Sequence, residues 1–274
     1  MKPLIFALRE TPPERLDLSP LTPERLAGLS AREIGEIRLG RSRRALTVGD
    51  LFRVSGEDFE TIVFEGGSKR FDGIGAGMGD GTILVTGDVG AQAGRKMRGG
   101  RLMIEGGAGP HAASAMRGGR LEILGDAGDH LGGPLAGELA GMNGGVVVVR
   151  GRAGAYAADR MRRGVAVVLK GCGDHAGSRM IAGTFAVTGP IGRLPGYMMR
   201  RGSILLDREP ERLSPGFVEC GAPDSAFAAV FDRYLMAEGV LKRPLLGPRP
   251  GKFGGDNAVA GTGEILFQIG RAHV

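Results

Sequence analysis

Short aliphatic runs recur along the middle of the chain, and glycine or polar residues bound each of them. Examples are Thr82–Val85, Leu102–Ile104 and Val146–Val149. Runs of this length and composition between glycines are typical of β-strands. No interval between them has room for a helix beside its strand, which argues against leucine-rich and ankyrin-like repeats. The pattern therefore predicts an all-β repeat domain.

Methionine marks the period of the repeat. Successive members of one set lie nineteen residues apart, with a single interval of twenty-six: Met78, Met97, Met116, Met142, Met161, Met180 and Met199. A glycine follows each of them after three residues, and glycine or alanine stands sixteen residues after all but the last. We expect each unit to be one coil of a right-handed parallel β-helix, with glycine at the corners. The methionines would then form an internal stack, where flexible thioethers fill the interior.

The repeat divides the chain into three segments. These are an irregular N-terminal segment, the β-helix repeat domain and a C-terminal capping segment, which span 1–57, 58–206 and 207–274. In the last segment we predict a helix over 224–238, with Asp224 as its N-cap, and a strand over Glu264–Ile269. The helix would cover the open end of the stack, where strand edges would otherwise be unpaired. Its buried face would be lined by Phe227, Phe231, Tyr234 and Leu235.

Seven extra residues interrupt the period before Met142. They run from Gly132 to Glu138 and must bulge from one corner while the stack continues. Insertions in repeat proteins form loops on one face, which is often the binding face. We therefore expect this loop to mark a working surface.

Composition narrows the classes of function. The 274 residues carry a formal charge of +6, with no Trp and only three Tyr. Scarce aromatic side chains disfavour a single-stranded nucleic-acid-binding protein, which needs stacking platforms. The two cysteines, Cys172 and Cys220, lack metal-type spacing and indicate a reducing compartment. No run is apolar enough for a membrane span or a secretory signal, so we expect a cytoplasmic protein without membrane or nucleic-acid partners.

Three histidines share one position of the repeat. His111, His130 and His175 each lie fourteen residues after their methionine, a position that Gln92 and Tyr156 also occupy. Adjacent units would bring His111 and His130 to about 5 Å from each other, the spacing of paired strands. A metal or proton-transfer site is one interpretation, and a polar column at a corner is the other. We favour the column, because two histidines without a third close ligand seldom bind a metal.

Arginine also recurs at fixed offsets from the repeat methionine. Stacked units would align these side chains in a stripe with a spacing of about 4.8 Å. Like charges at that distance repel by about 1 kcal/mol per pair even in water. The stripe is either a solvated edge that discourages pairing between molecules or the binding site of an anionic partner. As candidate binding residues we select Arg98, Arg101, Arg117, Arg120, Arg162 and Arg163.

The sequence offers no Ser-His-Asp order, paired carboxylates or metal-ligand cluster, so we predict neither a catalytic nor a metal site.

The repeat and its flanks resemble known families. The spacing Gly87-x-x-Gly90-x-x-x-Gly94 resembles the glycine-rich C-terminal domain of the glutamate synthase large subunit. With Leu51–Val54, Asp72–Met78 and Gly254–Ile265 included, the chain is more similar to the C subunit of formylmethanofuran dehydrogenase. The resemblance implies a right-handed β-helix subunit without an active site of its own. Such a subunit holds together others that interconvert formyl groups and formate on a furan carrier.

The resemblance also implies partners. In archaea the complex is a molybdenum or tungsten dehydrogenase. In methylotrophic bacteria it is a formyltransferase/hydrolase that uses methylofuran and tetrahydromethanopterin. The other subunits would be an amidohydrolase-like hydrolase, a formyltransferase and a dehydrogenase-like B subunit. The excess of arginine over lysine is typical of proteins encoded by GC-rich bacterial genomes, and it favours the bacterial complex. The archaeal complex and a glutamate-synthase-like scaffold are the alternatives.

A carrier follows from the same resemblance. We expect no cofactor bound by ligands of the chain itself. Methylofuran-type carriers bear polyglutamyl tails, which would be present at the level of the complex. The planar fork of arginine binds carboxylates in a bidentate manner. The stripe would therefore hold such a tail or face an acidic protein partner.

Overall fold

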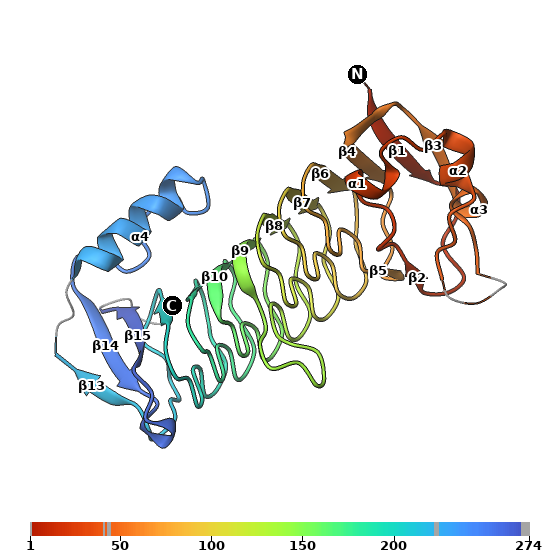
Figure 1. Cartoon of the computed structure of the whole chain (residues 1–274). Helices are drawn as coiled ribbons and strands as arrows, with labels where there is room; N and C mark the ends of the chain where they lie inside the picture. The colour runs from red at the N-terminus through yellow and green to blue at the C-terminus, as the bar shows by residue number, and fades with distance from the viewer. Residues whose placement is uncertain (1, 41, 43–44, 222–224, 270–274) are drawn as a thin grey trace.

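The computed structural model describes residues 2–40, 42, 45–221 and 225–269, and within them the chain is mostly β (Figure 1). Thirteen strands form one sheet in the order β13-β14-β15-β12-β11-β10-β9-β8-β7-β6-β4-β1-β3. Their bounds are β1 Pro3–Leu8, β3 Phe52–Ser55, β4 Asp58–Glu65, β6 Thr82–Val85, β7 Arg101–Ile104, β8 Arg120–Ile123, β9 Asn143–Val149, β10 Arg163–Val168, β11 Thr184–Val187, β12 Ser203–Leu206, β13 Val218–Cys220, β14 Pro250–Gly255 and β15 Gly263–Gln268. A small second sheet pairs β2 (Leu16–Asp17) with β5 (Phe71–Asp72). The helices are α1 Pro23–Leu26, α2 Ala31–Gly35, α3 Val48–Leu51, α4 Ser225–Ala237 and the 3-10 turn Asn257–Val259. The all-β prediction is confirmed.

The repeat units stack in constant register. Thr82 of β6 pairs with Arg101 of β7, which pairs with Arg120 of β8, nineteen residues further on at each step. After the longer interval Arg120 pairs with Val146 of β9, and all pairs from β4 to β12 are parallel. A second row of parallel bridges joins Val89, Ala108, Ala127, Ala153, Cys172 and Ile191. Each unit therefore pairs with its neighbours along two rows, and a given offset lies above the same offset of the next unit.

The interior column of methionines is confirmed, because all seven side chains are fully buried. The small residues at offset sixteen have a steric reason. A Cβ at Gly177 would lie 2.6 Å from Ile204 Cδ1, and one at Gly75, the equivalent position nineteen residues before Gly94, would lie 2.8 Å from Leu102 Cδ2. Core aliphatic side chains of other units thus fill the space that a larger residue would need.

The corner before six of the seven repeat methionines uses a left-handed backbone at alternate residues, and Met142, which follows the insertion, is the exception. In one unit Gln92, Gly94 and Lys96 have φ of 65°, 65° and 55°, although two of them are not glycine. The N–H groups of Gln92 and Lys96 donate to the following unit, at Pro110 O (2.9 Å) and Ser114 O (2.9 Å). The N–H of Gly94 donates to Ile74 O of the preceding unit at 2.8 Å. These inter-unit bonds offset a left-handed cost of roughly 1–2 kcal/mol per non-glycine residue.

Helix α4 lies in a different place from the one we predicted. It packs along the outer face of the sheet and not over the end of the stack (Figure 1). The face that it buries contains Ala228, Phe231 and Leu235, whereas Phe227 remains 41% exposed. Tyr234 is half-buried. The predicted N-cap, Asp224, lies outside the described residues.

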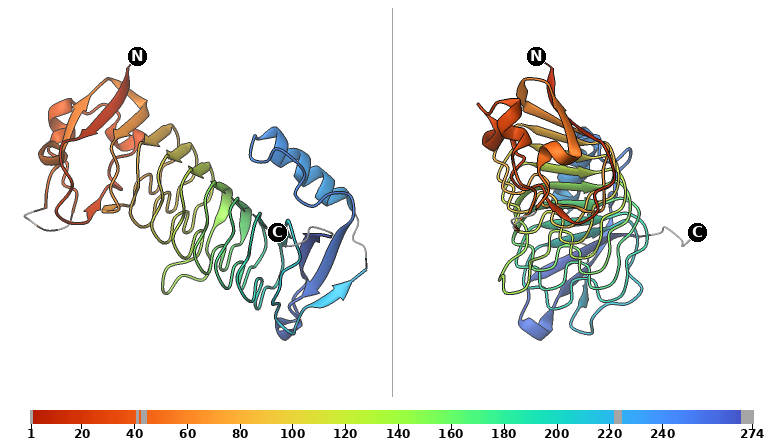
Figure 2. Two further views of the ribbon diagram at one scale, coloured as in Figure 1. Left: turned by 180° about the vertical axis from the view of Figure 1, so that it is seen from behind. Right: turned by 90° about the vertical axis from the view of Figure 1, so that its right-hand side faces the viewer.

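Antiparallel strands close the two ends of the parallel sheet. At one end β3 pairs antiparallel with β1, and at the other β14 pairs antiparallel with β15 and β13. Figure 2 shows from two further sides that these groups of strands lie at opposite ends of the stack. Strand β3 therefore lies at an end of the sheet, outside the parallel rows of the repeat. The predicted final strand is β15, which continues the parallel row beside β12.

We expect Met116→Asp to lower the free energy of unfolding by about 3 kcal/mol or more, because it places an unpaired charge in a closed apolar column. The measurement is urea denaturation followed by circular dichroism. The matched control is Arg117→Gln, which changes the exposed neighbour of Met116 and is expected to act by less than about 0.5 kcal/mol. Equal effects of the two substitutions would contradict an interior methionine column.

Candidate functional site

Five of the six selected arginines are exposed at the corner that leads into the strands. Among the described residues, no hydrogen bond or ion pair engages the side chains of Arg98, Arg101, Arg117, Arg162 and Arg163. Backbone bonds set their spacing. The N–H groups of Arg98, Arg117 and Arg162 each donate to the methionine carbonyl of the preceding unit, at 2.7, 2.7 and 2.8 Å. The stripe is thus a row of guanidinium groups on a fixed backbone, without side-chain partners among the described residues.

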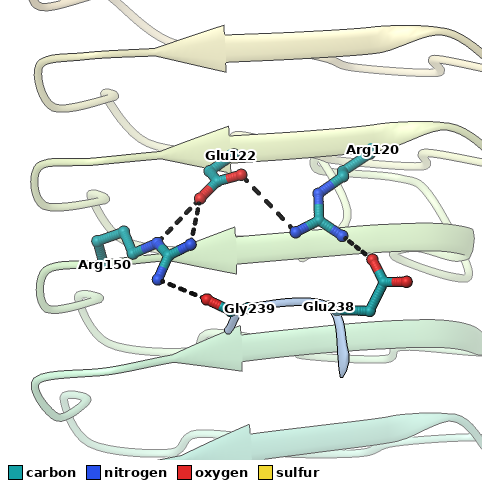
Figure 3. Close-up of polar contacts among 5 residues, drawn as sticks. All are labelled: Arg120, Glu122, Arg150, Glu238 and Gly239. Carbon is teal, nitrogen blue, oxygen red and sulfur yellow. Dashed lines mark hydrogen bonds and ion pairs between the residues drawn. The ribbon is translucent and has the colours of Figure 1, made fainter. Parts of the chain in front are cut away.

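Arg120 belongs to a different arrangement. Its Nη1 donates to Glu238 Oε2 at 2.8 Å, and its Nη2 lies 3.7 Å from Glu122 Oε2 (Figure 3). Glu122 also pairs with Arg150 at 2.7 Å, and Arg150 donates to the carbonyl of Gly239 at 3.3 Å. The network fastens the end of α4 to β8 and β9. Arg120 is therefore engaged within the chain and differs from the other five selected arginines.

The histidine position forms a stack of rings. His111 and His130 lie 4.8 Å apart between ring centroids with planes 4° apart, and Tyr156 and His175 continue the stack at 5.1 and 4.9 Å. The Nδ1 atoms of the three histidines are buried without a hydrogen-bond partner. Parallel rings at this distance direct their nitrogens alongside one another and not at a common ion. Within the described part of the chain, no group of three potential metal-ligating side chains occurs.

The aspartates beside the histidines have a structural role. Asp129 Oδ1 accepts from the N–H of Ala155, and Asp174 Oδ1 accepts from the N–H of Arg193, both at 2.8 Å. Each carboxylate thus bonds to the backbone of the next unit. This geometry supports the polar column over a proton-transfer site.

A groove on the surface is lined by acidic residues that are similarly engaged. It has a volume of about 630 Å³ and lies over the row of bridges that includes Ala108 and Ala127. Asp88 and Asp126 line it, and their carboxylates accept from the N–H groups of Gly107 and Arg152 at 2.8 Å. These carboxylates therefore brace the backbone from one unit to the next.

Burial affects two titratable groups of the stack. The pKa of His111 is lowered, first by burial and then by the neighbouring charge of His130. Burial raises the pKa of the Cys172 thiol to about 12, so this thiol stays protonated and unreactive at neutral pH. Burial therefore favours the uncharged form of both side chains.

We expect the free energy of unfolding to fall as the pH drops below about 6.5, the ordinary histidine value. A native pKa below the unfolded one means that the unfolded chain binds the proton more tightly, so acid favours unfolding. His111→Asn should reduce this dependence, since asparagine does not titrate and tolerates the φ of 60° at this position. The measurement is the urea midpoint at pH 5.5 and 7.5 for both proteins. An identical pH dependence in the variant would contradict the lowered pKa of His111.

Columns of like side chains on a stacked parallel sheet define a repeat protein. The comparisons with known proteins identify the family. The chain superposes with a TM-score of 0.91 and 43% identity on a chain of the crystal structure of the formyltransferase/hydrolase complex FhcABCD from Methylorubrum extorquens with methylofuran. The match covers 97% of this chain and 100% of that one. The protein belongs to the family formed by the C subunits of formyltransferase/hydrolase complexes and formylmethanofuran dehydrogenases, which confirms the resemblance read from the sequence.

Two curated relatives agree with this assignment over shorter regions. The C subunit of the formyltransferase/hydrolase complex Fhc of Methylorubrum extorquens is 49% identical over 83 residues, which cover 30% of this chain and 31% of the relative. The C subunit of the tungsten-containing formylmethanofuran dehydrogenase 2 of Methanothermobacter thermautotrophicus is 34% identical over 99 residues, 34% of this chain and 37% of the relative. The matched regions thus span about a third of each curated relative. No family profile matches the sequence.

Proposed function

We propose that this chain is the scaffolding C subunit of a bacterial formyltransferase/hydrolase complex. The complex would transfer a formyl group from tetrahydromethanopterin to methylofuran and hydrolyse it to formate. The observation that carries the proposal is the 43% identity over nearly the whole chain to a component of such a complex. An archaeal-type tungsten dehydrogenase is the second candidate, favoured by the relative that is 34% identical. The higher identity to the bacterial relative, 49%, supports the first.

We also propose that the parallel rows close into a right-handed parallel β-helix, with residues 58–206 as the repeat domain between the segments 1–57 and 207–274. Support comes from the two rows of parallel pairs that each unit forms with its neighbours. Connections between parallel strands of one sheet are right-handed in nearly all known cases. A stack of this kind gives long, flat and rigid lateral faces, which suit the docking of large neighbours.

The role of the chain follows from these faces. The other subunits would be an amidohydrolase-like hydrolase, a formyltransferase and a dehydrogenase-like B subunit, and the chain would hold them without turnover of its own. Among the described residues, no helix is long and apolar enough to cross a membrane. We place the complex in the cytoplasm, in line with its proposed place in one-carbon metabolism.

We expect affinity purification of the full chain from cells that make all subunits to recover the hydrolase, the formyltransferase and the dehydrogenase-like B subunit together. The measurement is the composition of the eluate by mass spectrometry, with its formyl-hydrolysing activity. The free chain, purified alone, should be inactive. A free chain that turns over formylmethylofuran would contradict the scaffold role.

The unpaired arginines supply a second test, which concerns the carrier. We propose that Arg98, Arg117 and Arg162 attract the polyglutamyl tail of methylofuran or an acidic surface of a partner protein. Replacement of all three by Gln removes three charges from exposed side chains. We expect a several-fold loss of retained methylofuran, and a weaker dependence of retention on salt. The control variant is Arg53→Gln, since Arg53 is exposed on β3 at the end of the sheet.

The outcomes separate the two interpretations. Loss of methylofuran from an intact complex supports the tail, and loss of assembly supports a protein interface. Unchanged assembly and retention would mean that the stripe is only a solvated edge, and would contradict both.

A further inference from the structure

The outer face of the sheet presents one central column of side chains, and α4 covers only part of it. The strand register aligns one outward residue from each strand: Val63, Leu84, Met103, Glu122, Val148, Val167, Ala186, Leu205 and Leu266. The last five lie in one hydrophobic cluster with α4 and with Val240, Leu245 and Leu246 of the segment that follows it, and each is at most 2% exposed. The covered part of the column is therefore a closed core between helix and sheet.

The part of the column beyond α4 is also apolar but has no cover. Val63, Leu84 and Met103 are only half-buried and belong to neither hydrophobic cluster of the described chain. Ile5 of β1 pairs with Val63 and extends the strip by one strand, again half-buried. In Figure 1 α4 ends before this region, and β6 and β7 carry no helix above them. The same column is thus a buried core in one half and an open apolar strip in the other.

An arginine lies beside this strip, at the same position of the repeat as the arginine that holds the end of α4. Arg120 stands next to the column on β8 and binds Glu238, directly after the end of α4, at 2.8 Å. Arg101 pairs with Arg120 in register on β7, one unit away, and it is exposed without a carboxylate partner. Beside the open strip, Arg101 on β7 therefore occupies the position equivalent to Arg120 on β8, which binds the carboxylate of Glu238 at the end of α4.

The dimensions fit a short helix. α4 has 13 residues, about 20 Å at 1.5 Å per residue, and together with the segment that follows it the helix covers five strands from β9 to β15, about 19 Å across. The open strip crosses the four strands β1, β4, β6 and β7, about 14 Å, which corresponds to roughly ten helical residues or three turns. A second copy of α4 does not suit the strip, because its apolar residues Ala228, Phe231 and Leu235 are already buried against its own sheet.

We propose that the outer face of β4, β6 and β7 is the docking site of an amphipathic helix from another member of the complex. The helix places apolar side chains on Val63, Leu84 and Met103 and a carboxylate on Arg101. It continues the layer that α4 begins, so that the whole sheet face becomes covered upon assembly. This inference rests on the proposed function for the identity of the partner, while the surface itself is defined by this chain.

The test uses the full chain with the three other subunits produced together. Leu84→Lys and Arg101→Glu should each weaken the association at least tenfold in a binding titration, whereas Arg101→Lys should retain most of it. The control is Val218→Lys, which changes a 54% exposed residue on β13 and should bind like the unmodified chain. Circular dichroism and the urea midpoint of each free variant establish that the fold is unchanged, as expected for half-buried and exposed positions.

The outcomes also separate this inference from the proposed function. If the unmodified chain fails to bind the three subunits, the proposed function fails. If it binds and Leu84→Lys binds equally well, the docking site is overturned. A concentration-dependent dimer of the free chain that Leu84→Lys dissociates would assign the strip to a second copy and would also overturn the proposal.

Discussion

The structure depends on one constraint, the constant register by which each residue lies on its equivalents in the neighbouring units. Backbone bonds such as Gln92 N–H to Pro110 O and Gly94 N–H to Ile74 O fix this register on both sides of a unit. A residue type that suits one position of the unit therefore tends to recur at that position in every unit and to form a column. Gly75 is small because Leu102 of another unit occupies the space of its Cβ. Stability thus comes from contacts between neighbouring units.

The register has opposite consequences for different side chains. The repeat methionines are fully buried and fill the interior, and the rings of His111 and His130 stack face to face at 4.8 Å. Guanidinium groups in a column repel one another, and Arg98 and Arg117 lie exposed without a carboxylate partner among the described residues. Arg120 illustrates the solution within the chain, since Glu238 neutralises it while fastening α4. The arginines without carboxylate partners and the uncovered apolar strip of the free chain are the surfaces that partner subunits would cover in the proposed complex.

The sequence was sufficient for the features that obey the period, and insufficient for those that do not. The unit length, the buried methionines and the ring column all follow from offsets alone. The position of α4 was missed, although the unbroken apolar runs Val146–Val149 and Val165–Val168 signal strands covered on both faces. The pairing of Arg120 with Glu238 joins residues 118 positions apart and has no local signature. Strands β1 and β14 lie outside the periodic part of the sequence, so the repeat could not predict that they pair with the sheet.

We propose that this chain binds its partners through columns of outward-facing side chains, which a closed interior holds in place. Hydroxyl-radical footprinting of the free chain and of the assembled complex, read by mass spectrometry, tests it most directly. Met103 is half-buried on the outer face, whereas Met116 is fully buried inside the stack. We predict that Met103 is oxidised in the free chain and protected in the complex, while Met116 is protected in both. Equal oxidation of Met103 in both states, or oxidation of Met116 in the free chain, would contradict the account.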